Sequence, residues 1–273
     1  MKPFLKWPGG KREQVKLLIE RLPSQYNMYI EPFVGAGALF LYLQPEYCII
    51  NDLNTQLINC YERIRDSLDE VLDYIDEFNK HNINKNYFLL QRKKYNRKIL
   101  AGQNDIEHAA LTIFLNKTCF NGLFRLNKNG QFNSPWNQSD AKVSLDRNNL
   151  KLVSNYLKTI KIYNEDFEKI CNLAKENDFV YMDPPYIPQD NSKGIFTSYT
   201  RAGFNKNDHE RLADIFFRLD KKGVKVMLSN HNTEYINELY KNYNKEIVKA
   251  NRHINSDGTK RDKVEELLIR NYS

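Results

Sequence analysis

Short apolar runs alternate with helical patterns at both ends of this 273-residue chain, and this alternation restricts its fold more than any other feature. Strands are predicted at 28–33, 47–50, 159–163, 179–182, 224–228, 246–250 and 264–270, and helices at 13–22, 167–176, 208–221 and 233–240. Further helices are expected from Ala38 and after Asn54, which suits a helix cap. Strands that alternate with helices favour an α/β fold, with a parallel-rich sheet covered on both faces.

The middle of the chain, from about residue 67 to 157, has mainly helical patterns and one hairpin-like stretch at 120–135. Residues 85–130 contain nine lysines and arginines against two acids, an excess that equals the net charge of +7 of the whole chain. Aromatic residues are interleaved with these charges, which is typical of nucleic-acid binding, although a solvated helix face has the same pattern. We therefore expect one domain from residues 1–57 and 158–273, with a helical insertion at 58–157.

Composition excludes several classes of protein. Hydrophobic residues make up 41%, which is enough for a packed core, and no apolar run is long enough for a membrane span. The first residues do not have the pattern of a signal peptide. The four cysteines are scattered without a CxxC pair, so neither a zinc site nor a disulfide framework is expected. We expect a cytoplasmic protein with no metal and no membrane partner.

A glycine turn and an acidic residue follow the first two predicted strands. Gly35-Ala36-Gly37 lets a ligand approach the backbone, but the dinucleotide fingerprint needs a third glycine where this chain has Phe40, which disfavours NAD. Asp52 can accept hydrogen bonds from both hydroxyls of a ribose, or it can simply cap a helix. Together these residues predict a pocket for an adenosine-type cofactor that makes no demand for phosphate binding.

The most informative string is Asp183-Pro184-Pro185-Tyr186, directly after the strand at 179–182. It offers an acceptor carboxylate, a carbonyl held by the rigid proline turn and an aromatic stacking face within four residues. Two acceptors and a ring match the exocyclic amino group of a planar base. The alternative is a plain turn after a buried strand.

Four motifs follow one another along the chain: FLKWPGGK at 4–11, EPFVGAG at 31–37, NDLN at 51–54 and DPPY at 183–186. In this order they resemble DNA adenine-N6 methyltransferases of the Dam/DpnII type, the D12 class with alpha-type motif order. The resemblance continues through 121–137, 229–232 and 258–268. It implies a Rossmann-like S-adenosylmethionine-dependent methyltransferase sheet, with residues 58–157 as an inserted, mainly helical DNA target-recognition domain. The implied reaction methylates N6 of an adenine flipped out of double-stranded DNA, with GATC as the site and S-adenosylhomocysteine as the product.

The resemblance also implies roles for the residues at matching positions. The cofactor would be bound by Trp7, Lys11, Glu31, Phe33, Gly35, Gly37, Asp52, Asp166, Phe167 and Asp183. Catalysis would rest on Asp183, Pro184, Pro185 and Tyr186, with no metal. DNA would be contacted by Lys6, Phe120, Asn121, Leu123, Arg125 and Pro135. Arg125 would read a guanine and Phe120 would fill the gap left by the flipped base, although Phe120 and Leu123 could instead form the core of the hairpin.

Two other functions stay open at this point. DPPY-like strings also serve methylation of cytosine N4 and of amino groups on RNA bases. A non-catalytic DNA-binding relative is a third possibility, which the intact Trp7, Lys11, Asp52 and DPPY oppose. The expected partners are double-stranded DNA and a cognate restriction endonuclease that acts on the same site without forming a stable complex. The protein is expected to be a monomer or weak dimer, associated with the nucleoid.

Overall fold

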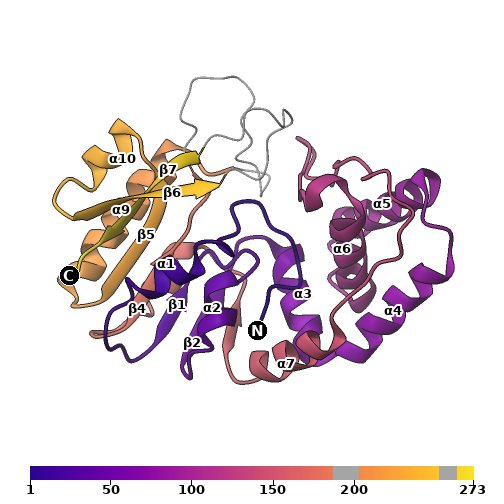
Figure 1. The fold of residues 1–273 in the computed structure, drawn as a ribbon, viewed down its shortest axis with the longest axis horizontal. Helices are drawn as coiled ribbons and strands as arrows, with labels where there is room; N and C mark the ends of the chain where they lie inside the picture. Colours follow the sequence, from indigo (N-terminus) through magenta and orange to yellow (C-terminus); the bar gives the residue numbers. More distant parts are fainter. Residues whose placement is uncertain (187–202, 252–262) are drawn as a thin grey trace.

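The computed structural model describes residues 1–186, 203–251 and 263–273, and within them a seven-stranded sheet has the order β3-β2-β1-β4-β5-β7-β6 (Figure 1). Its strands are β1 Tyr29–Glu31, β2 Cys48–Asn51, β3 Lys161–Tyr163, β4 Phe179–Met182, β5 Lys225–His231, β6 Asn244–Asn251 and β7 Lys263–Arg270. Strands β1 to β5 pair in parallel, whereas β7 runs antiparallel to both β5 and β6. The predicted parallel-rich α/β sheet is confirmed.

Most helices begin at a side-chain cap. The helices are α1 Val15–Ile19, α2 Ala38–Leu43, α3 Thr55–Asp66, α4 Leu68–Lys80, α5 Lys85–Leu100, α6 Ile106–Thr118, α7 Arg147–Leu157, α8 Phe167–Cys171, α9 Lys206–Lys221 and α10 Glu234–Leu239. Asn54 caps α3 as predicted, because its side chain accepts a hydrogen bond from Leu57 N. The helices predicted at 13–22 and 167–176 are shorter, because both tighten into turns with i→i−3 bonds. Among the described residues, no helix is both long and apolar enough to cross a membrane.

Side chains of the sheet alternate between two apolar clusters. On β4, Phe179 and Tyr181 belong to one cluster, while Val180 and Met182 belong to the other. Helices α8, α9 and α10 cover the second cluster. The first cluster includes buried residues of α1 to α3 and continues into α6, which lies beside α3 in Figure 1, and into α4 and α5, which pack on α6. Both faces of the sheet are therefore covered, as predicted, and the middle helices share a core with the sheet.

Four acidic residues lie at one edge of the sheet. Glu31 ends β1, Asp52 directly follows β2, and Asp183 directly follows β4. Because β7 is antiparallel, its beginning lies at this same edge, where Glu266 pairs in register with His231 at the end of β5. This carboxyl edge is where open α/β sheets bind their ligands.

The hairpin-like stretch folds back on itself without forming regular strands. It starts with a 3-10 turn, Phe120–Gly122, and its antiparallel pairing includes an isolated bridge between Leu126 and Phe132. A side chain of α5 takes the place of a strand, because Asn96 donates to Phe132 O at 3.0 Å and accepts from Phe132 N at 2.8 Å. The predicted hairpin is thus an irregular loop held against α5.

Candidate active site

A buried lysine lies among three acceptors at the carboxyl edge. The Nζ atom of Lys11 is 3.1 Å from Asp183 Oδ1 and 3.1 Å from Glu266 Oε2, and it also donates to the Tyr186 hydroxyl. Burial acts to lower the pKa of Lys11, but the two carboxylates outweigh it and raise the pKa above its ordinary value. Lys11 is therefore a charged group at neutral pH, although it is only 5% exposed.

The DPPY turn delivers two of these acceptors. Burial raises the pKa of Asp183 to about 6, with Lys11 opposing the rise and Glu266 adding to it. The Tyr186 hydroxyl donates to Glu266 Oε2 at 3.1 Å, and its ring lies edge-on to His231 with centroids 4.7 Å apart. The structure thus brings together Lys11, Asp183 and Tyr186, which motifs had indicated. It adds Glu266, which lies in the 258–268 motif but was assigned no role, and which the antiparallel direction of β7 brings to this edge.

Asp52 is tied to the glycine turn. Its Oδ2 accepts from Gly35 N at 3.1 Å and its Oδ1 accepts from Asn54 N at 2.9 Å. Burial raises the pKa of Asp52 to about 6, and these two backbone N–H groups oppose the rise. Since Asn54 caps α3 through its own side chain, the helix does not need Asp52 as its cap. The carboxylate instead joins the ends of β1 and β2.

The two glycines are required for different reasons. Both have positive φ, 49° at Gly35 and 70° at Gly37. A Cβ on Gly35 would lie 3.1 Å from Trp7 Cδ1, so this turn sits directly against the Trp7 ring. A Cβ on Gly37 would run into the Phe40 ring and lie 2.8 Å from the Tyr61 hydroxyl, so the protein's own packing already requires glycine there.

The remaining predicted cofactor residues lie on neighbouring elements. Glu31 is 3% exposed, and burial raises its pKa to about 8. The rings of Phe33 and Phe167 are 5.2 Å apart, which brings the end of β1 to the start of α8. Arg211 of α9, which the motifs did not indicate, binds both oxygens of Asp166 at 3.2 and 2.9 Å and covers the Phe167 ring at 4.3 Å.

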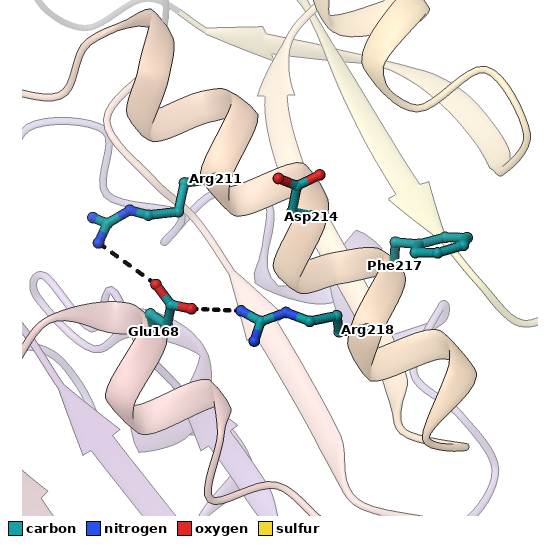
Figure 2. A pocket seen from close by; sticks show the side chains of 5 residues that line it. All are labelled: Glu168, Arg211, Asp214, Phe217 and Arg218. Carbon is teal, nitrogen blue, oxygen red and sulfur yellow. Dashed lines mark hydrogen bonds and ion pairs between the residues drawn. The ribbon is translucent and has the colours of Figure 1, made fainter.

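A surface hollow between α8 and α9 is lined by Glu168, Arg211, Asp214, Phe217 and Arg218 (Figure 2). Glu168 bridges its two arginines, at 2.6 Å from Arg218 Nη2 and 3.7 Å from Arg211 Nη1. These charges are largely satisfied by one another. None of the catalytic motif residues lines this hollow, whereas Asp183 and Tyr186 lie at the carboxyl edge.

In the irregular loop at 120–135, one asparagine orients the predicted base-reading arginine. Arg125 Nε donates to Asn133 Oδ1 at 2.7 Å and Arg125 Nη2 donates to Asn133 O at 3.2 Å. Phe120 is 47% exposed and is not part of a hairpin core. Leu123 is half-buried, and Asn121 and Pro135 are exposed. The loop is packed instead on Phe124, Leu126 and Phe132, which are buried.

The N-terminal segment contacts this loop. Lys6 N donates to Asn116 Oδ1 at 2.9 Å, and Asn116 Nδ2 donates back to Lys6 O at 2.8 Å and to Gly122 O at 3.0 Å. The side chain of Lys6 is so close that a Cβ on Gly122 would lie 2.7 Å from it. One residue further on, Trp7 stacks on Phe124 with centroids 4.9 Å apart. Segments more than 100 residues apart are thus joined at this point.

Part of the basic stretch is neutralised within the protein. Lys98 lies 2.6 Å from Asp105 and 3.0 Å from Glu107, and Lys94 pairs with Glu107 as well. Arg92 donates to Ser134 O at 3.1 Å and so supports the loop. The two acids in this stretch therefore offset the charge of two of its lysines.

Comparisons with known proteins show the family to which this chain belongs. The family model described as D12 class N6 adenine-specific DNA methyltransferase matches residues 7–254. The type II methyltransferase M1.LlaDCHI of Lactococcus lactis subsp. cremoris is 38% identical over 274 residues, covering 100% of this chain and 96% of the relative. The type II methyltransferase M.MjaIII of Methanocaldococcus jannaschii is 41% identical over 292 residues, covering 100% and 99%.

A third relative widens the range of similar proteins. The DNA adenine methylase of Escherichia coli (strain K12) is 31% identical over 270 residues, covering 97% of this chain and 93% of the relative. The sheet also agrees with the Rossmann-like methyltransferase fold that the motifs imply. Because the matches span nearly the full length of both partners, this chain belongs to the D12 class of N6 adenine-specific DNA methyltransferases.

Proposed function

We propose that this enzyme transfers a methyl group from S-adenosylmethionine to N6 of an adenine that it has flipped out of duplex DNA, within the site GATC. The observation that carries the proposal is Asp183, half-buried after β4 in the DPPY turn and flanked by Lys11 and Tyr186. Family membership favours adenine N6 over cytosine N4 or an RNA base. The assembled cluster favours an enzyme over a non-catalytic DNA-binding relative.

The charges at the carboxyl edge suit a cationic cofactor. S-adenosylmethionine supplies the methyl group as a sulfonium, and Asp52, Asp183 and Glu266 stand at this edge against the cation of Lys11. We assign Asp52 to the ribose hydroxyls, Phe33, Asp166 and Phe167 to the adenine, and Trp7, Glu31, Gly35 and Gly37 to the methionine side. Lys11 would link the cofactor site to Asp183.

Asp183 and Pro184 would prepare the amino group of the target base. The lone pair of adenine N6 is delocalised into the ring, which makes it a poor nucleophile. Hydrogen bonds from N6 to the Asp183 carboxylate and the Pro184 carbonyl would stabilise the positive charge that develops during transfer. Lys11 and Tyr186 both hydrogen-bond to the Asp183 carboxylate, and N6 would bind to one of its remaining lone pairs. Correct placement of N6 is the other main contribution.

Residues 58–157 would recognise the DNA target sequence, and residues 1–57 together with 158–273 would catalyse methyl transfer. Flipping the adenine costs a few kcal/mol, and stacking on Tyr186 would return about 1–3 kcal/mol. The exposed ring of Phe120 would fill the gap in the duplex. Arg125 would read a guanine with the edge of its guanidinium that Asn133 leaves open. Leu123 and Pro135 would pack on a thymine methyl group, and Lys6 and Asn121 would add further DNA contacts.

The test is a methylation assay on duplexes that contain GATC or a single-base variant of it. Modified-base sequencing identifies the methylated atom and position, and calorimetry measures S-adenosylmethionine binding. We expect N6-methyladenine in GATC duplexes, and an Asp183→Asn protein serves as the control for contaminating activity. Methylation of cytosine N4 or of RNA, or no binding of the cofactor, would each overturn the proposal.

A further inference from the structure

Glu266 is an acid in which three donors converge on one oxygen. Lys11 Nζ, Gln14 Nε2 and the Tyr186 hydroxyl each lie 3.1 Å from its Oε2. These donors come from the N-terminal segment and from the turn after β4, whereas Glu266 itself belongs to β7. Its side chain is only 13% exposed, so it is a member of the buried cluster and not a surface charge.

The cluster gives Lys11 a choice of two carboxylates. A buried cation needs an anionic partner, because an uncompensated buried charge is strongly unfavourable. If Glu266 were neutral, Asp183 would be the remaining carboxylate in contact with Lys11. The ammonium group would then hold the carboxylate that has to accept hydrogens from adenine N6. A second anion weakens this competition, because Lys11 divides its contacts between the two carboxylates.

We propose that Glu266 is a positioning residue for methyl transfer, which holds Lys11 and Tyr186 so that Asp183 stays available to the amino group of the base. Glu266 does not touch the base in this scheme. It acts through the Lys11 ammonium and through the Tyr186 hydroxyl, whose hydrogen bond orients the stacking ring. The inference rests on the function proposed above for Asp183.

The pH dependence of the reaction carries a signature of this role. Five ionisable groups from different elements surround Asp183: Lys11 of the N-terminal segment, Tyr186 of its own turn, Glu266 of β7, Tyr181 of β4 and Glu31 of β1. His231 of β5 lies against Tyr186. Glu266 raises the pKa of Asp183, whereas Lys11 lowers it. Removing the charge of Glu266 therefore lowers the pKa of Asp183, and the carboxylate stays ionised to lower pH.

The experiment measures kcat against pH for Glu266→Gln, Glu266→Asp and Glu265→Gln. Glu266→Gln should lower the plateau of kcat at least about tenfold, with KM for DNA changed less than about threefold. The pKa of about 6 for Asp183 predicts an acidic limb near pH 6 in the parent enzyme, and in Glu266→Gln this limb should move to lower pH. Glu266→Asp keeps the charge, so its limb should stay in place. Glu265 is the exposed neighbour that accepts from Asn232, and Glu265→Gln should match the parent in every respect.

Three outcomes decide the matter, once thermal melting has shown that each variant is folded. A parent-like kcat and limb in Glu266→Gln would overturn the inference. A lower plateau with an unmoved limb would also overturn it, because it would show that the charge of Glu266 does not act on Asp183 in the working enzyme. Failure of the underlying function looks different: an active Asp183→Asn enzyme would remove the basis of the scheme whatever Glu266 does.

Discussion

The carboxyl edge and the loop at 120–135 are held together by different kinds of side chain. At the carboxyl edge, two partly buried carboxylates meet around the buried ammonium group of Lys11. In the loop at 120–135, neutral amides make the structural contacts. Asn96 and Asn116 hydrogen-bond to backbone groups, and Asn133 orients Arg125. Charges act most strongly when they are buried. Amides fix the shape of an exposed loop without adding charges that would attract or repel phosphates.

This contrast has a direct consequence for substitutions. A change at the carboxyl edge alters the charge that the chemistry requires, so it should act on kcat or on cofactor affinity. A change in the loop alters shape or base contacts, so it should act on the choice of DNA sequence or on stability.

Asp183→Asn should have the largest effect. It keeps the shape of the side chain but removes the charge, and kcat should fall by about 10²–10³-fold, as for other preorganised groups in active sites. Lys11 keeps Glu266 as its partner, so the fold and DNA affinity should be retained. Single-turnover methylation and a DNA-binding titration check both parts. Activity within about tenfold of the parent would mean that the charge is dispensable.

Asp52→Ala comes next and should act on cofactor affinity. Loss of hydrogen bonds to a charged group should weaken S-adenosylmethionine binding by about 1.5–3 kcal/mol, measured by calorimetry. The matched control is Asn54→Ala, which removes the cap of α3 and should reduce stability by about 1 kcal/mol without affecting the cofactor. If the two variants behaved alike, Asp52 would serve only the local fold.

Arg125→Ala tests the loop. A guanine contact is worth about 1–3 kcal/mol of discrimination, so rates on GATC and on a duplex with the guanine replaced should converge. Asn133→Ala should also make the two rates converge, but by a smaller amount, because the side chain of Asn133 no longer orients the guanidinium group of Arg125. Equal proportional losses on both duplexes would instead indicate a phosphate contact. Lys93 is exposed on α5, and Lys93→Ala is the comparison variant for which we expect equal proportional losses on both duplexes.

Asn96→Ala should have the smallest effect on activity. The variant loses both hydrogen bonds to Phe132, which should lower the free energy of unfolding by about 1–3 kcal/mol in urea denaturation. Cofactor affinity should stay at the parent value, since α5 takes no part in the carboxyl edge. A weakened cofactor affinity would show that the two regions are less independent than their contacts indicate.

Much of the carboxyl edge could be predicted from sequence because its geometry follows from strand order. Residues that follow parallel strands meet at one edge, which is why Asp52 and Asp183 were recognisable. Glu266 falls within the 258–268 motif but was given no role, because its position at this edge depends on the antiparallel direction of β7 and Lys11 lies 255 residues away. Strand direction cannot be read from one sequence.

The loop was less predictable, since side-chain-to-backbone bonds leave no periodic pattern. Nothing in the spacing of Asn96 and Phe132 marks them as partners. The basic stretch shows the same limit: Asp105 and Glu107 were visible, but only the packing of α5 on α6 brings them to Lys98. The predicted 258–262 part of the C-terminal motif lies outside the described residues.

The contact between the N-terminal segment and the loop bears on attempts to change the target sequence by exchanging parts between relatives. A transplanted loop would have to accept the Trp7 ring on its own aromatic residue and leave room for Lys6 where Gly122 now stands. A relative's loop evolved against its own N-terminal segment, so the smallest transferable unit comprises both pieces. Chimeras that carry residues 4–7 together with 120–135 should therefore keep a parent-like melting temperature where exchange of the loop alone lowers it.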